Sequence, residues 1–229
     1  MGANAVTTVP VYTAGEVLTA ADMNITNSGI PVFATTVTRD AAFGGSGEKT
    51  LAEGQFAYIE ATNATQYYDG AAWVGLGAKV AQVLAVQKND SFSTTSSSFV
   101  DLTGLTLTIT PTSASSTILI GYTVQGTGVA ATNMGVIQIV RGSTAIGNAA
   151  AAGSRSVGNT VVSELAVAEI GQQASFYMDS PATTSATTYK LQIRQTVSGT
   201  VFVNRTNSDT DTSAFGRGTS SLILMEITA

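Results

Sequence analysis

The fold of this chain is decided by stretches in which apolar and polar residues alternate, most clearly 105–110 (LTLTIT) and 189–194 (YKLQIR). Successive side chains of a β-strand point to opposite faces of its sheet, so each stretch gives a strand with one apolar and one polar face. From residue 78 onward such segments follow one another, separated by turns rich in Ser, Thr, Gly and Asn. This pattern predicts a jelly-roll-like antiparallel β-sandwich over residues 78–229.

The expected strands of the sandwich are short and closely spaced, as is typical of two packed sheets. They are 80–87, 99–110, 117–125, 135–141, 161–169, 174–179, 188–196, 200–204 and 220–227. The alanine run 149–152 is short and ends at Gly153, so we interpret it as a loop and not as a helix.

Residues 46–77 predict a small β-meander with strands at 55–60, 66–68 and 71–76. Asp69-Gly70 is a strong signal for a tight hairpin, because glycine tolerates positive φ. Two interpretations of the aromatic residues in this segment stay open. The favoured one is that the rings form a small core, and the other is that Tyr67, Tyr68 and Trp73 form a stacking platform for a glycan.

Residues 1–45 lack sustained periodicity and are interpreted as an N-terminal extended arm. Thr19, with Asp22 three positions later, predicts one or two helical turns. The apolar residues of this segment are scattered, so we expect them to need the surface of a partner. The candidate attachment residues are Tyr12, Val17, Leu18, Met23 and Phe33. The complete expectation is an all-β protein with an arm (1–45), a meander (46–77) and a sandwich (78–229).

The composition excludes several classes of function. The chain has no histidine and no cysteine, which excludes Ser-His-Asp and Cys-His nucleophiles, imidazole zinc sites and disulfides. Its ten basic residues are scattered and its net charge is −5, so we expect no nucleic-acid binding. No apolar run approaches the roughly 18 residues that span a bilayer, and the start lacks a secretory pattern. We therefore expect no membrane insertion and synthesis in the cytoplasm.

Charged residues make up only 11% of the chain, against roughly 25% in ordinary soluble proteins. A neutral, hydroxyl-rich surface lacks the self-repulsion that keeps monomers apart, so the composition favours self-association.

The acidic residues offer weak candidates for chemistry. Asp209-Thr210-Asp211 alternates like a calcium loop but lacks the glycine and the terminal Glu of such loops. Glu164 with Glu169, or Asp179, fits a solvated strand face better than a glycosidase carboxylate pair. We predict no catalytic residue, no metal and no cofactor.

Several segments of the chain resemble parts of tailed-bacteriophage structural proteins. Residues 12–24 (YTAGEVLTAADMN), 38–40 (TRD) and 68–74 (YDGAAWV) are similar, in this order, to the N-terminal part of minor structural proteins of the virion. Residues 98–112, 176–194 and 218–227 look like the sandwich of phage fibre and head-decoration proteins. The resemblance implies a homotrimer with a TNF-like or C1q-like jelly roll.

The resemblance thus implies a non-enzymatic trimer at the surface of a virion, made in the cytoplasm of a bacterial host. Tail or fibre location, with adhesion to a host-surface glycan, is slightly favoured over capsid decoration or a head fibre. Its expected partners are its own copies and other virion structural proteins. A carbohydrate-depolymerising tail enzyme is the weaker alternative, because the chain shows no fixed-period repeat of the kind that builds a long β-helix.

Overall fold

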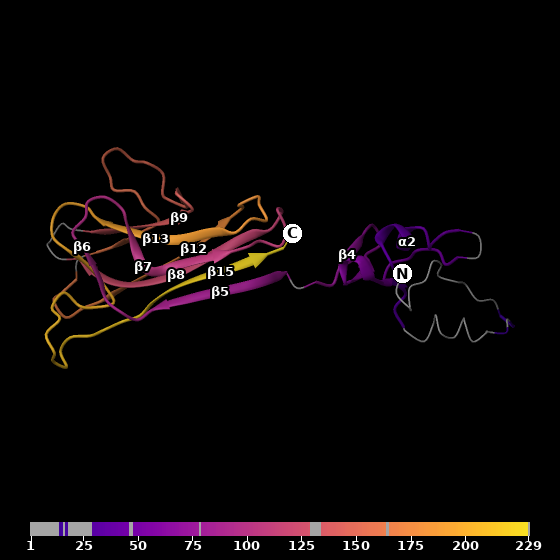
Figure 1. Cartoon of the computed structure of the whole chain (residues 1–229), viewed down its shortest axis with the longest axis horizontal. Helices are drawn as coiled ribbons and strands as arrows, with labels where there is room; N and C mark the ends of the chain where they lie inside the picture. The colour runs from indigo at the N-terminus through magenta and orange to yellow at the C-terminus, as the bar shows by residue number, and fades with distance from the viewer. Residues whose placement is uncertain are drawn as a thin grey trace. The chain divides into compact units, whose positions relative to one another are not determined.

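The computed structural model describes residues 14–15, 17, 29–45, 48–77, 79–128, 134–163 and 165–228. The chain divides into two compact units, Met1–Ala78 and Lys79–Ala229 (Figure 1). Almost all regular structure in the described residues is β-strand, as the sequence predicts. No helix in this part of the chain is long and apolar enough to cross a membrane.

The described part of the first unit is a four-stranded sheet with one short helix against it. The sheet order is β1 (Val32–Phe33), β2 (Phe56–Ile59), β3 (Ala64–Tyr68) and β4 (Trp73–Gly75). β1 runs parallel to β2, whereas the other pairs are antiparallel. Between β1 and β2 lies α2 (Thr36–Asp40), and the 3₁₀ turn η1 (Glu60–Thr62) connects β2 to β3.

Local polar contacts explain where the elements of this unit begin and end. Thr35 caps α2, because its hydroxyl accepts from the Thr38 amide while the Thr38 hydroxyl oxygen accepts from the Thr35 amide. The expected hairpin at Asp69-Gly70 is present. The Asp69 carboxylate accepts from the amides of Ala71 and Ala72, and Gly70 has a φ of +95°.

The expected arm differs from the structure at its C-terminal part. Phe33 lies in β1 and is fully buried with Ala42, Ala57 and Ile59 in the core of the first unit. Phe43 and Trp73 pack against this cluster. Residues 32–43 are therefore part of the sheet unit, because a two-residue parallel strand and one capped helical turn bury apolar side chains that show no periodicity in sequence.

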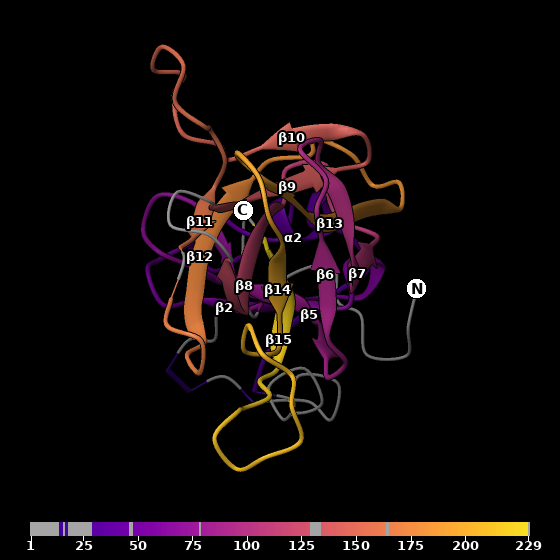
Figure 2. The same ribbon diagram turned by 90° about the vertical axis from the view of Figure 1, so that its left-hand side faces the viewer.

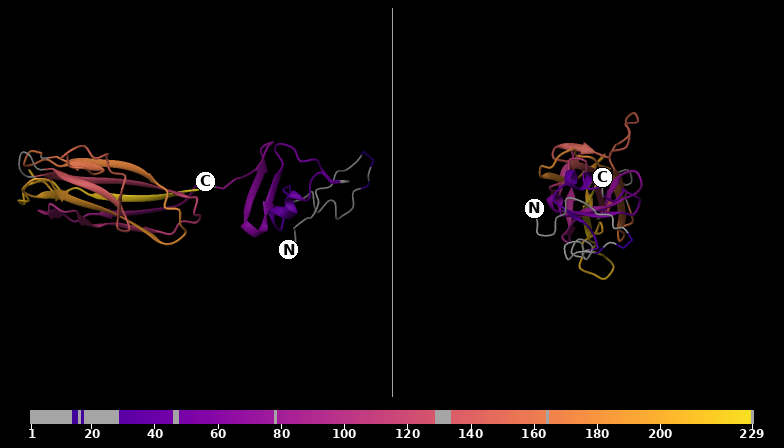
Figure 3. Two further views of the ribbon diagram at one scale, coloured as in Figure 1. Left: turned by 90° about the horizontal axis from the view of Figure 1, so that it is seen from above. Right: turned by 90° about the vertical axis from the view of Figure 1, so that its right-hand side faces the viewer.

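The second unit is a sandwich of two antiparallel sheets (Figures 2 and 3). Its strands are β5 (Val80–Lys88), β6 (Phe92–Thr94), β7 (Val100–Ile109), β8 (Thr117–Gly128), β9 (Gly135–Arg141), β10 (Thr144–Ile146), β11 (Thr160–Val162), β12 (Gly171–Asp179), β13 (Thr187–Gln195), β14 (Val201–Val203) and β15 (Ser220–Ile227).

Three pairs of these strands each act as a single interrupted strand. β14 and β15 pair with successive parts of β8. On their other side, β14 pairs with β6 and β15 pairs with β5. β10 and β11 likewise pair with successive parts of β9. Each interrupted strand keeps one direction across its gap.

Eight strands result, with the order 1-8-3-6 in one sheet and 2-7-4-5 in the other. Here strand 1 is β5/β6, strand 5 is β10/β11 and strand 8 is β14/β15. Two interleaved Greek keys of this kind define a jelly roll. The expected jelly-roll-like β-sandwich is thereby confirmed.

The core of the sandwich consists of the alternate, inward-facing residues of both sheets. Fully buried members include Leu105 and Ile109 of β7, Ile120 of β8, Leu191 of β13 and Leu224 of β15. The alternation at 105–110 and 189–194 thus marks strands whose apolar side chains meet between the sheets. The expected strand at 161–169 ends at Val162, and the short strands β6 and β10 were not expected.

The side chain of Asn204 forms hydrogen bonds at two of the strand interruptions, the one after β5 and the one between β14 and β15. Its backbone has a φ of +60°, and its buried amide nitrogen donates to the carbonyls of Lys88 (2.9 Å) and Asp90 (3.0 Å), where β5 ends. Its amide oxygen accepts from the Ser220 hydroxyl at the start of β15 (2.6 Å). One side chain therefore satisfies polar groups that the broken ladders leave unpaired.

We expect Asn204→Ala to lower the free energy of unfolding of the sandwich by about 3 kcal/mol. The substitution leaves buried carbonyls without donors and places a non-glycine, non-asparagine residue at positive φ. Urea denaturation followed by circular dichroism measures the change. Asn89→Ala, at a neighbouring exposed position, is the matched control and should change little. Equal stability of both variants would contradict the role given to Asn204.

Glu226 is a fully buried carboxylate at the other end of β15. Burial alone would raise its pKa, but donors surround it and hold the pKa at about 2, below its ordinary value of 4.5. Gln82 donates at 2.6 Å, and the amide and hydroxyl of Thr112 each donate at 2.7 Å. The ionised carboxylate thus ties β15 to β5 and to the turn before β8.

Because the pKa of Glu226 is lower in the fold than in the unfolded chain, its ionisation stabilises the fold above about pH 5. That stabilisation is lost as the pH falls through 4.5 towards 2. We expect Glu226→Gln to be less stable than wild type at pH 7 and to lose less stability between pH 5 and pH 2. Thermal melts across this pH range test this expectation, and parallel pH profiles for the two proteins would contradict it.

Candidate functional site

The predicted attachment residues are only partly covered by the structure. Tyr12, Leu18, Met23 and the helical turns expected near Thr19 lie outside the described residues. Val17 is 87% exposed. Phe33 is fully buried in the first unit, so its side chain is not available to a partner.

The three residues proposed for glycan stacking do not share one face. Trp73 and Tyr68 pack together with ring centroids 5.7 Å apart, and Trp73 also contacts Phe43 (5.8 Å). The guanidinium of buried Arg39 lies 4.7 Å from the Trp73 ring centroid. Tyr67, the neighbour of Tyr68 in β3, instead pairs with Phe56 at 6.4 Å on the opposite face of the sheet.

The carboxylates of the sandwich serve structural contacts. Asp179, expected on a solvated strand face, is buried; both of its oxygens accept from Arg141 at 2.9 Å, and one also accepts from Tyr189 at 2.6 Å. Burial and the neighbouring Asp179 both raise the pKa of Tyr189. Asp179 therefore lies among buried side chains, where Arg141 compensates its charge.

The other acidic candidates lie apart from Asp179 in the chain. Asp209 pairs with Arg217 (2.7 Å) and Arg205 (3.4 Å) within one loop, and Glu164 lies outside the described residues. Among the residues that the structure describes, no group of three or more His, Cys, Asp or Glu side chains could hold a metal ion.

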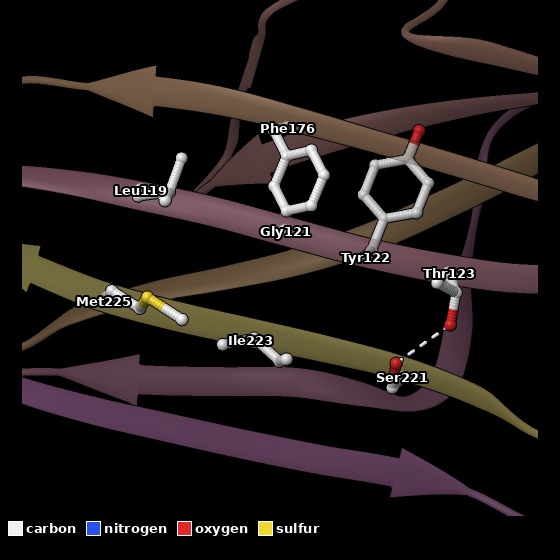
Figure 4. Close-up of a pocket in the computed structure, with 8 residues that line it drawn as sticks. All are labelled: Leu119, Gly121, Tyr122, Thr123, Phe176, Ser221, Ile223 and Met225. Atoms are coloured by element: carbon white, nitrogen blue, oxygen red, sulfur yellow. Dashed lines mark hydrogen bonds between the residues drawn. The ribbon is translucent and has the colours of Figure 1, made fainter.

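An apolar surface lies on the outer side of the sheet that contains β8, and Figure 4 shows the part of it that surrounds a pocket. The strand registers place its side chains in two rows, each crossing β12, β8, β15 and β5. We call this surface the apolar face. It consists of the row Met178, Leu119, Met225 and Val83 and the row Phe176, Gly121, Ile223 and Ala85.

Large side chains of the apolar face are in contact with solvent. Phe176 is 75% exposed, Val83 55% and Met178 48%. The ring of Phe176 lies across Gly121, where an added Cβ would stand 2.8 Å from the ring. Only glycine at this position lets the ring lie against the sheet, where it lines an apolar pocket with Leu119, Ile223 and Met225.

Continuous apolar runs in the sequence are the signal that could have revealed this face. Residues 222–225 (LILM), 118–120 (ILI) and 176–178 (FYM) are apolar at every position. Strands that are covered on both faces have this pattern, whereas a strand with one solvated face alternates.

The opposite sheet has a different outer side. Its strand β13 presents Lys190 and Gln192, which both donate to Asp101 of β7 (2.9 and 2.7 Å). The apolar residues on the outer side of β9, Val136 and Val140, are buried. The chain covers Val136 itself, because an added Cβ on Gly158, in the loop after β10, would lie 2.3 Å from the Val136 side chain.

Both ends of the sandwich's chain lie together at one end of the unit. The Thr228 amide donates to the Lys79 carbonyl at 2.9 Å, and β8 begins beside them at Thr117, opposite Ile227. β8 ends at Gly128, opposite Val201. The loops 165–170, 196–200 and 204–219 therefore lie toward the other end. Loops on a rigid sandwich are the usual carriers of contacts with partners.

No protein-family model and no curated protein sequence matches the chain. Capsid structures of infectious bursal disease virus are similar over part of their length. The Gt strain structure has 11% identity and a TM-score of 0.35 over 72% of this chain, and the VP2 subviral particle 15% and 0.32 over 70%. The matches cover 44% and 40% of those chains. Matches at this level do not assign a function.

Trp73 is the sole tryptophan, so its emission reports on the first unit alone. We expect Phe33→Ala to destabilise this unit by about 3 kcal/mol, because it removes a fully buried ring beside Phe43. The denaturation midpoint measured by Trp73 fluorescence should fall. Tyr67→Ala, which removes a half-buried ring on the other side of the sheet, is the control and should lower it less. An unchanged midpoint in Phe33→Ala would contradict the assignment of Phe33 to the core.

Proposed function

We propose that this chain is a homotrimeric structural protein at the surface of a tailed-bacteriophage particle, associated with the tail or a fibre. The observation that carries the proposal is the organisation of the sandwich. β5 begins and β15 ends at the same end of the sandwich, and the loops 165–170, 196–200 and 204–219 lie toward the other end. A scaffold of this kind suits a protein that is fixed at one end and meets its surroundings at the other.

The chemistry of the described residues supports a structural function. Asp179 and Glu226, the buried carboxylates of the sandwich, are held by Arg141 and Tyr189 and by Gln82 and Thr112. Jelly rolls with two packed sheets are a common scaffold of viral capsid proteins and lectins. The sequence resemblance to minor structural and fibre proteins of phages narrows this class to the virion of a tailed phage.

The same resemblance supports the proposed trimeric state, and the composition supports self-association. With 11% charged residues and no cysteine, the chain lacks both charge repulsion between copies and disulfides to stabilise an exposed protein. Burial of apolar surface between copies supplies stability that a single copy lacks.

Attachment to other virion proteins is assigned to the N-terminal residues. Tyr12, Val17, Leu18 and Met23 remain the proposed contacts, and buried Phe33 is withdrawn from this set. Adhesion to a host-surface glycan is assigned to the loops at the far end of the sandwich. We withdraw the platform of Tyr67, Tyr68 and Trp73, because these rings are divided between two faces of the small sheet.

Imaging of virions tests the proposed location. Gold-labelled antibodies against the purified chain should mark the tail or its fibres in electron micrographs of virions of the phage that encodes it. Label over the capsid would select the alternative, a decoration or head-fibre protein. The absence of label from intact virions, with the antibody still recognising the chain in infected cells, would overturn the proposal.

A further inference from the structure

We propose that the apolar face of the sandwich is the surface through which copies of this chain associate. This inference rests on the proposed function, in which the chain assembles with itself, and it names the surface. The occupant of the face is a second copy of the same chain.

The first argument is that the apolar residues on the outer side are buried in one sheet of the sandwich and exposed in the other. On β9 the chain covers Val136 with its own loop at Gly158, and Val140 is buried. On the opposite sheet Phe176, Met178 and Val83 stay exposed, although their strands have the continuous apolar sequence of strands covered on both sides. The sequence is therefore typical of a sheet that is buried on both sides. The described part of the sandwich places no segment over the outer side of this sheet.

The second argument is the absence of charge on this face. The row of residues next to the apolar ones is Ala174, Thr123, Ser221 and Gln87, followed by Gln172 and Gln125. These polar groups satisfy one another, since the hydroxyls of Thr123 and Ser221 lie 2.9 Å apart and Gln125 donates to Gln172 at 2.9 Å. Two copies of a neutral face can meet without repulsion, whereas a face with charges of one sign repels its copy.

The shape and size of the face also fit a second copy. Gly121 lets the Phe176 ring lie against the sheet beside an apolar pocket, and in a trimer the three copies of this face can turn toward the threefold axis and pack against one another there. The two apolar rows extend over about four residues of four strands spaced about 4.8 Å apart and cover about 250 Å², and together with the uncharged polar rows beside them they cover about 500 Å². The apolar rows form a patch of a few hundred Å², a size that is often functional on a monomer, and the larger area can form the centre of an interface of roughly 800 Å² per partner.

The test measures the mass of the full chain by light scattering over a range of concentrations. Wild type should form an oligomer of 23.3 kDa subunits, and Phe176→Asp should weaken its association at least about 30-fold, shifting the mass toward one subunit. Phe176 is exposed in the single chain, so the charge should leave the fold intact, as circular dichroism can check. Val197→Asp, at a 63% exposed loop position away from the face, is the matched control and should stay oligomeric.

A second variant guards against an effect of charge alone. Gly121→Ala adds a methyl group beneath the Phe176 ring and should tilt the ring out of the face, which weakens association without adding charge. An oligomer that neither Phe176→Asp nor Gly121→Ala weakens would overturn the inference while leaving self-assembly standing. A wild-type chain that is monomeric at all concentrations would overturn the inference and the proposed trimer, but label on the virion would still support the proposed location.

A cysteine probe identifies what covers the face, because the chain has no other thiol. The thiol of Ala85→Cys should react with maleimide at least about tenfold more slowly in the oligomer than in the same variant carrying Phe176→Asp. Thr106→Cys, on the outer side of the opposite sheet, should react at one rate in both backgrounds. Protection of Ala85→Cys that persists in monomeric Phe176→Asp would show that the chain covers its own face and would overturn the inference.

Discussion

The structure of the sandwich depends on one constraint: apolar side chains at alternate positions of eight strands must meet between two sheets. No disulfide is available to hold the sheets together, so this burial and the hydrogen-bonded ladders supply the stability. Two of the interior polar contacts lie where strands break or end. Asn204 lies where two strands break, and Glu226 occupies an inward position near the end of β15.

The sequence predicts the sandwich well because its strands are long and periodic. Alternation at 105–110 and 189–194 identifies β7 and β13 and their inward residues. Elements of two or three residues, such as β1, β6 and β10, carry no periodic signal, and their pairing is decided by contacts distant in sequence. The segment 165–169 contains strand-forming residues but lies in a loop. The strand ends at Val162 because β11 pairs with only three residues of β9, which begins at Gly135.

The candidate sites were harder to predict than the fold. Neighbouring rings in sequence, such as Tyr67 and Tyr68, point to opposite faces of a strand, so clustering along the chain does not give a platform in space. The attachment set failed at Phe33 for a different reason, since a single residue gives no sign of whether its partner is distant in the same chain or in another. Alternation alone does not predict the apolar face, because its signal is the opposite pattern, namely runs such as 118–120 and 222–225 that are apolar at every position and indicate a sheet covered on both sides.

The three strand interruptions have an evolutionary consequence. On each side of a gap the two half-strands keep their direction and their shared partner, so a longer or shorter loop between them alters no register. Doubling the length of a flexible loop costs only about 0.6 kcal/mol. The segments 149–157 and 205–219 can therefore vary in length and composition while Asn204 and Gly158 keep their contacts with the strands, so this scaffold can acquire new contacts without having to be rebuilt.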